Sequence, residues 1–186
     1  MDNQKKDRRL LIQQQQLALL YSAIPNSLLA NLFGCLVGIM IFTPRVEQYR
    51  LYIWVGLMLS VNCLRYFNYW QYRKAKDVLA DLDLWYVKFR IGALVLAFAL
   101  GSSGFLLFVY HNSSYQMLLA LLIVIIGSFA TTTLSPHRPI VVAFLLIVFF
   151  PIVTTLFFLA TEVSQYFSWL LILLTVMLII SALGSN

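Results

Sequence analysis

Charged residues are scarce in this chain, and their scarcity sets the class of protein. Only 11% of the 186 residues are charged, 61% are hydrophobic, and the mean hydropathy is +0.85. A soluble domain of this length would be roughly half apolar. The composition therefore excludes an ordinary soluble domain and predicts an integral membrane protein.

Residues that bind metals or carry out catalysis are equally scarce. The two cysteines, Cys35 and Cys63, fall inside apolar segments and are expected to pack there, so they predict no disulfide framework. The two histidines, His111 and His137, fall on opposite sides of the predicted membrane and cannot share a metal or haem. No nucleophile, base and orienting group occur together. We therefore expect no catalytic residues, no metal and no cofactor, and the segment is not predicted to be an enzyme.

What the chain has instead is a series of long apolar runs. About 20 apolar residues cross the bilayer core as a helix, and HNSSY at 111–115 divides a charge-free stretch that is too long for one span. We predict an all-α, polytopic membrane protein with six transmembrane helices at residues 17–42, 51–72, 91–110, 116–134, 140–160 and 167–183. No Asp or Glu falls within these spans, so the buried carboxylates typical of ion coupling are missing.

The basic residues predict the orientation of the chain, because short cytoplasmic loops carry an excess of Lys and Arg. With a cytoplasmic N-terminus, only Arg45 and Arg50 lie outside. The other bases then lie on the inner side: Lys5, Lys6, Arg8, Arg9, Arg65, Arg73, Lys74, Lys76, Lys88, Arg90 and Arg138. We therefore predict that both termini are cytoplasmic.

The segment LRYFNYWQYRKA (64–75) combines Arg65, a group of aromatic residues and a cluster of bases. At the inner end of the second predicted span, such a mixture is typical of an interfacial anchor that faces anionic headgroups. Arg65 falls about 9 Å short of the inner edge of the bilayer core, a distance that its long side chain can largely cover. The lipid bilayer explains this segment without nucleic acid, which we do not expect as a partner.

Two further segments predict short amphipathic cytoplasmic helices. In DVLADLDLWYVKFR (77–90), one helical stripe is formed by Val78, Leu82, Trp85 and Phe89. This helix is expected to lie on the membrane or to dock on the bundle. KKDRRLLIQQQQ, within residues 1–16, indicates a basic surface helix that contacts either lipid or a partner module.

Small residues and prolines predict how the spans pack. Two seams have four-residue spacing and allow helices to approach closely in lipid: Ala30, Gly34 and Gly38 in the first span, and Ala93, Ala97 and Gly101, extended by Ser102, Ser103 and Gly104, in the third. Two roles are open for these seams: packing of helices within the bundle, and dimerisation. Pro25 and Pro151 can bend the first and fifth spans, because proline removes a backbone donor.

Polar side chains inside the spans are the candidate ligand-binding residues. Asn31 in the first span, with Asn62 and Arg65 in the second, must find partners where water is absent. Hydrogen bonds between helices or to the backbone would satisfy them. Alternatively, these residues converge on an intramembrane pocket for a small, partly apolar ligand. We take Asn31, Asn62 and Arg65 as the candidate ligand-binding set.

The order of these features resembles a known type of domain. LYSAIPNSLLANL (20–32), LRYFNYWQYRKA (64–75), Trp85 before the third span, and SPHRPIVVAFLLIVFFPIV (135–153) carry the resemblance. It is to the N-terminal six-helix, MASE-like sensor region of bacterial signalling proteins, which precedes PAS, GGDEF/EAL or histidine-kinase modules. The resemblance implies an input domain in the bacterial inner membrane that regulates a cytoplasmic output module and forms a homodimer through that module.

The C-terminus departs from that resemblance. Such proteins continue beyond their membrane region, whereas this sequence ends at residues 184–186, directly after an apolar run and without anchoring bases. We hypothesise that residues 184–186 mark a truncation point and that the sequence is an excised sensor domain.

Two functional classes follow. We favour a sensory input domain that responds to a small apolar ligand or to the state of the membrane and regulates a diguanylate cyclase, a phosphodiesterase or a histidine kinase. The alternative is a small transporter or permease subunit, or a structural subunit of a membrane complex. No repeat relates the first three spans to the last three, which speaks against a transporter.

Overall fold

The computed structural model confirms the all-α prediction. It describes residues 2–75, 81–110, 112–134, 137–159 and 162–184, with side chains for 11–75, 81–110, 112–129, 133–134, 137–158 and 165–184. These residues form helices and no strand. The helices are α1 (Asp2–Ser22), α2 (Ile24–Phe42), α3 (Gln48–Lys74), α4 (Leu82–Gly101), α5 (Ser103–Leu106), α6 (Ser113–Leu134), α7 (Arg138–Leu159) and α8 (Glu162–Gly184).

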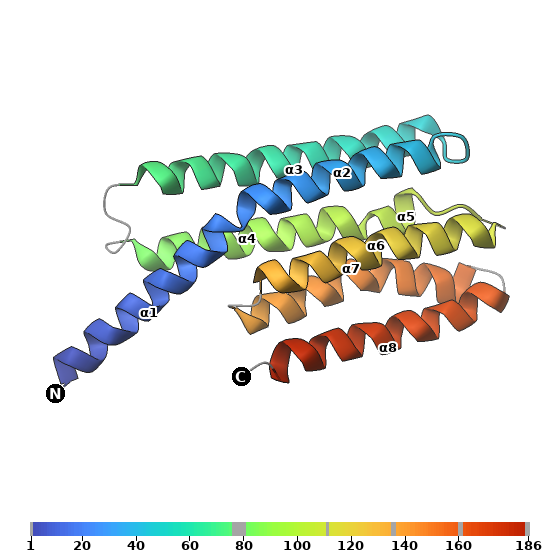
Figure 1. Cartoon of the computed structure of the whole chain (residues 1–186). Coiled ribbons are helices and arrows are strands. Elements are labelled where there is room, and N and C mark those ends of the chain that lie inside the picture. The colour runs from blue at the N-terminus through green and yellow to red at the C-terminus, as the bar shows by residue number, and fades with distance from the viewer. Residues whose placement is uncertain (1, 76–80, 111, 135–136, 160–161, 185–186) are drawn as a thin grey trace.

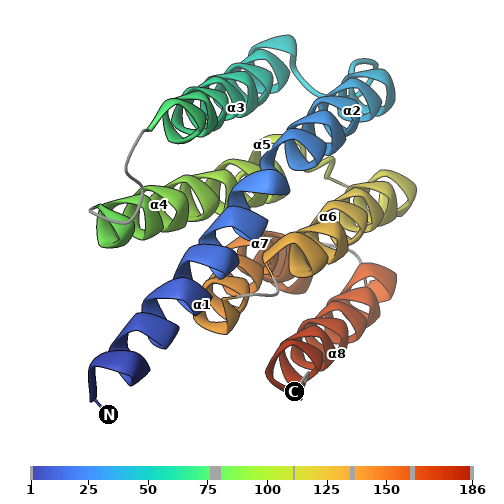
Figure 2. The same ribbon diagram turned by 60° about the vertical axis from the view of Figure 1, so that its left-hand side comes forward.

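The long helices form one bundle. Helices α2, α3, α4, α6, α7 and α8 lie side by side, and successive ones run in opposite directions, so the two chain termini lie towards the same end (Figure 1). Helix α7 is central, because it contacts α4, α5, α6 and α8. Seen from another side, α3 and α8 lie at opposite edges of the bundle (Figure 2).

Four helical segments are long and apolar enough to cross a membrane, two fewer than the six spans predicted. Within the described residues they are Leu11–Phe42, Leu82–Leu106, Arg138–Phe158 and Gln165–Gly184. Helix α6 supplies a shorter apolar stretch, Ser113–Phe129. Helix α3 is long enough at 27 residues, but its arginines, lysine and amide side chains lower its hydropathy.

The first predicted span is divided, and Pro25 is the physical reason. Helix α1 ends at Ser22, and α2 begins at Ile24 with Pro25 in its first turn. Proline has no backbone N–H to donate to the carbonyl four residues earlier, so the chain turns at Ala23. From this turn α1 leaves the bundle obliquely (Figure 1), which confirms that the span is bent. The described part of the predicted segment 1–16, from Asp2 onwards, therefore belongs to one helix that continues to Ser22.

The predicted amphipathic helix at 77–90 is not a separate element. Helix α4 begins at Leu82 and continues without a break to Gly101. Leu82, Trp85 and Phe89 are buried against the bundle, so their stripe docks on protein, while Val78 lies outside the described residues.

The third predicted span, 91–110, also needs correction at its end. The helix stops at Gly101, resumes for the short α5, and ends at Leu106. The Ser102 hydroxyl donates to the carbonyl of Ala99 at 2.8 Å, and the Ser103 hydroxyl to that of Leu100 at 2.6 Å. Serine side chains that bond to backbone carbonyls in this way compete with regular helix bonding.

Both predicted small-residue seams are used for packing within the bundle. A Cβ on Gly34 would lie 2.7 Å from the Ile126 side chain of α6, and one on Gly38 would lie 3.0 Å from the Trp54 ring of α3. In the second seam, a Cβ on Gly101 would lie 2.6 Å from the backbone oxygen of Ile147. Glycine is therefore what lets α4 approach the backbone of α7.

Candidate functional site

The three predicted ligand-binding residues lie in a buried set of hydrogen bonds between α2 and α3. Asn31 Nδ2 donates to Asn62 Oδ1 at 3.2 Å, and Arg65 Nη1 donates to Ser27 Oγ at 2.9 Å. On α2 the two partners are four residues apart, and on α3 they are three apart. The two bonds therefore lie about one helical turn from each other on the same pair of faces.

These side chains therefore make hydrogen bonds between helices, which is the first of the two alternatives that the sequence left open; the other is a ligand pocket. All four residues are buried, with 3–8% of their surfaces exposed. Asn62 Nδ2 is buried and has no hydrogen-bond partner among the residues that the structure describes. Of the predicted set, Arg65 also borders a small cavity, to which Asn31 and Asn62 do not contribute. Ligand binding by these three residues stays a prediction.

An aromatic cluster joins the end of α1 to α3 and α4. The ring of Tyr21 stacks on that of Tyr72, with centroids 3.8 Å apart and planes 13° apart. The ring of Trp85 is nearly perpendicular to both, with interplanar angles of 86° to Tyr21 and 81° to Tyr72, and Tyr21 Oη donates to the backbone oxygen of Trp85 at 3.2 Å. Edge and stacked contacts of this kind add to the energy of burial, so the cluster fixes the start of the bundle where α1 diverges.

Tyr72 therefore packs within the protein, but other members of its segment face outwards. Tyr66, Phe67 and Trp70 are 58%, 52% and 44% exposed. The ammonium of Lys74 lies 3.7 Å from the centre of the Trp70 ring. Exposed rings beside a base are the arrangement expected of the predicted interfacial anchor.

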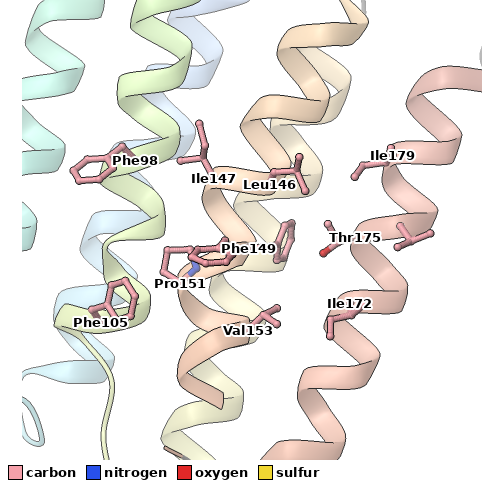
Figure 3. A pocket seen from close by; sticks show the side chains of 12 residues that line it. Phe98, Phe105, Leu146, Ile147, Phe149, Pro151, Val153, Ile172, Thr175 and Ile179 are labelled. Carbon is pink, nitrogen blue, oxygen red and sulfur yellow. The ribbon is translucent and has the colours of Figure 1, made fainter. Parts of the chain in front are cut away.

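A large apolar groove lies beside α7. It has a volume of about 760 Å³, within the range of pockets that hold small molecules. Its walls come from three parts of the chain (Figure 3): Phe98 and Phe105 of α4 and α5, Leu146, Ile147, Phe149, Phe150, Pro151 and Val153 of α7, and Ile172, Thr175, Val176 and Ile179 of α8.

The groove offers almost no hydrogen bonds to a ligand. Thr175 is the one residue in its lining with a polar side chain, and that hydroxyl already donates to the backbone oxygen of Leu171 at 2.7 Å. An occupant would be held by apolar contact alone, at roughly 25 cal/mol per Å² of buried surface. The groove is therefore suited to an alkyl or acyl chain and unsuited to a polar metabolite.

Pro151 shapes the middle of the groove. Because proline has no N–H, the carbonyl of Ile147 loses its usual helical donor, and this oxygen faces Gly101 of α4. The hydroxyls of Thr154 and Thr155 donate to the Pro151 oxygen at 2.9 and 2.7 Å. The close approach of α4 to α7 thus occurs on the side of α7 that carries the groove.

Helix α8 forms one wall of the groove and is the least buried of the four apolar segments of membrane-spanning length. Only 17% of its apolar stretch is buried, against 50% for α7. At its C-terminal end, Arg138 Nη1 donates to the backbone oxygen of Leu183 at 2.9 Å. Basic side chains commonly bond to the last carbonyls of a helix, and here one connects the beginning of α7 to the end of α8.

Sequence reasoning missed the groove because an apolar lining does not stand out in an apolar chain. Pro151 was the one signal, since it marked the fifth span as irregular. In the part of the chain that the structure describes, no three residues among His, Cys, Asp and Glu group as a metal site would require. Comparison of the chain with protein-family models, with curated proteins and with solved structures finds no match.

Proposed function

We propose that this chain is a membrane-embedded sensory domain with six membrane-crossing helices and both termini in the cytoplasm. The number of crossings is supported by the six helices that lie side by side in the bundle, each of 19 residues or more. Within the predicted span 51–72 of α3 the one charged side chain, Arg65, is directed to Ser27 inside the bundle rather than to lipid, as polar side chains in membrane helices generally are.

The distribution of bases supports the orientation. Arg73 and Lys74 end α3 and Arg138 begins α7, at the end of the bundle towards which both termini lie (Figure 1). At the opposite end, Arg45 lies between α2 and α3, and Arg50 lies in the first turn of α3. The excess of positive charge supports a cytoplasmic location for the first of these ends.

The observation that carries the sensory proposal is the apolar groove with α8 as one wall. A lipophilic molecule with an alkyl or acyl chain enters the groove between α7 and α8 and contacts Ile172, Val176 and Ile179. Such a molecule favours whichever position of α8 gives it more contact, and a difference in affinity between two positions shifts their populations. Of the four apolar segments of membrane-spanning length, that of α8 has the smallest buried share, so a change in its position disturbs few contacts apart from those with its neighbours α6 and α7.

The resemblance to MASE-like regions supports the setting of this domain. In that setting the chain lies in the bacterial inner membrane, and the helix that leaves the bundle after α8 regulates a cytoplasmic output module. That module would be a diguanylate cyclase, a phosphodiesterase or a histidine kinase, and it would hold two copies together. The partners of the chain are then a small apolar ligand, the bilayer and a second copy of the chain.

A distance measurement between α3 and α8 tests the sensory proposal. Spin labels are placed at Lys74→Cys and Ser181→Cys, both exposed, with Cys35 and Cys63 replaced by Ala and the protein in lipid nanodiscs. The inter-label distance is then recorded with and without 1-decanol as an apolar probe. We expect the alcohol to shift the distance distribution, because occupation of the groove changes the position of α8.

Two tryptophan variants separate the groove from a general effect of decanol on the bilayer. Ile172→Trp fills the groove from α8, whereas the neighbouring Leu173 lies outside its lining and is 56% exposed. The shift should disappear in Ile172→Trp and persist in Leu173→Trp. An equal shift in both variants would contradict the proposal, as would substrate uptake by vesicles that contain this chain alone, which would instead indicate a transporter.

A further inference from the structure

A second, much smaller cavity lies at the basic end of the bundle, apart from the apolar groove. It is bordered by Tyr21 at the end of α1, by Arg65 and Asn68 of α3, and by Lys88 and Gly92 of α4. Its volume is about 10 Å³, which is room for one atom the size of a water oxygen. Unlike the groove, it has cationic and polar side chains in its lining, beside the apolar Ile24 and Phe89.

Arg65 brings more donors to this cavity than the protein satisfies. The side chain is only 6% exposed, and a guanidinium carries five N–H donors. Within the described residues, its one hydrogen-bond acceptor is the Ser27 hydroxyl. Its stem passes over Gly92, where an added Cβ would lie 3.6 Å from Arg65 Cγ, so the charged end is held in place beside the cavity.

Lys88 adds a second positive charge to the same cavity. Its ammonium lies 3.5 Å from Gln71 Oε1 and 4.4 Å from the centre of the Trp85 ring. Both partners are uncharged, and no carboxylate of the described residues lines the cavity. Two cations at low dielectric without a counter-charge are unfavourable, and an anion between them would relieve that cost.

From this arrangement we propose that the Arg65–Lys88 cavity binds the phosphate group of an anionic molecule. One phosphate oxygen occupies the enclosed space and bonds to Arg65, whose planar fork suits phosphate. The remaining oxygens stay on the open side, which is formed by the half-buried Asn68 and Lys88. The phosphate comes either from an anionic lipid, since basic pockets between helices bind headgroups, or from a soluble phosphate. This site is separate from the groove and does not depend on sensing.

Native mass spectrometry of the detergent-solubilised full chain tests this site. The probes are phosphatidylglycerol, zwitterionic phosphatidylcholine and inorganic phosphate, each titrated against the wild type, Arg65→Gln, Lys88→Gln and Lys74→Gln. Lys74 is the matched control, because it is an exposed base at the same end of the bundle and lies outside the cavity. Lys88 is half-buried, so its variant keeps the test valid if Arg65→Gln does not fold.

We expect one saturable phosphatidylglycerol adduct on the wild type that phosphatidylcholine does not replace. Loss of a charged hydrogen bond should weaken this adduct about tenfold in Lys88→Gln and leave it nearly unchanged in Lys74→Gln. Displacement of the lipid by millimolar inorganic phosphate would identify a soluble phosphate as the ligand, and resistance to displacement would identify the lipid. Equal affinity of Lys88→Gln and Lys74→Gln, or no adduct with either phosphate source, would overturn the proposal.

Discussion

Replacement of Gly101 by alanine tests how closely α4 and α7 pack at the groove. The added Cβ would lie 2.6 Å from the backbone oxygen of Ile147 and 3.4 Å from Pro151 Cγ and Val148 Cα. Real Cβ atoms essentially never come within 3.0 Å of another heavy atom, so a gap of at least about 0.4 Å must open. Because the obstacle is backbone, no side-chain rotation can open that gap, and α4 must move away from α7.

The cost of this movement follows from what overpacking does in a dense interior. Extra methyl groups that force backbone shifts destabilise proteins by about 1–3 kcal/mol. For a chain of this size, 1 kcal/mol corresponds to about 2–4 °C in Tm. We therefore expect Gly101→Ala to lower Tm by about 4–8 °C for a central cost of about 2 kcal/mol, measured by thermal unfolding in detergent.

Gly56 is the matched control for this substitution. It lies within α3 and an added Cβ would meet nothing within 4 Å. Alanine there gains helix propensity, by up to about 1 kcal/mol, so Gly56→Ala should leave Tm unchanged or raise it. If Gly101→Ala and Gly56→Ala unfold at the same temperature, α4 and α7 are not packed backbone to backbone, and the geometry of the groove is wrong.

Three further substitutions test the other contacts. Arg138→Gln removes the bond to the Leu183 oxygen, so hydrogen exchange in the last turn of α8 should become faster, and unchanged exchange would show that the contact does not hold α8. Leucine at Asn31 leaves buried Asn62 Oδ1 without a donor, which should cost about 1–3 kcal/mol. The double variant Asn31→Leu/Asn62→Leu should be more stable, by about 0.6 kcal/mol, than the sum of the two single losses of stability predicts. If the two losses simply add, the hydrogen bond between these side chains does not contribute. Tyr72→Ala removes the ring stacked on Tyr21, so proteolysis of α1 should accelerate, whereas Tyr72→Phe should keep the protection. Equal cleavage of these two variants would refute the role of the ring.

The helical architecture was largely predictable, because apolar runs of about 20 residues leave few alternatives. The turn at Ala23 was also accessible, since Pro25 was recognised as a point of bending. The continuity of α4 was not, because the charges of Asp81 and Lys88 beside the apolar stripe suggested a surface helix, although Trp85 and Phe89 pack inside. A charge pattern reports which residues face outwards and does not report whether a helix continues into the next span.

The candidate sites were also only partly predictable from the sequence. Polar residues in an apolar segment are conspicuous, so Asn31, Asn62 and Arg65 were found from the sequence, although their partners were not. The second cation of the small cavity, Lys88, lies on another helix, and only the tertiary structure brings it to Arg65. The apolar groove depends on the spacing of whole helices, which hydropathy does not encode.

The central claim is that an apolar molecule in the groove changes the position of α8. The most direct measurement is the distance between labels at positions 74 and 181 in nanodiscs, with and without 1-decanol, in the wild-type background and in Ile172→Trp. We expect a shift of the distance in the first protein and none in the second. A distance that does not change in either protein, or that changes equally in both, would contradict it.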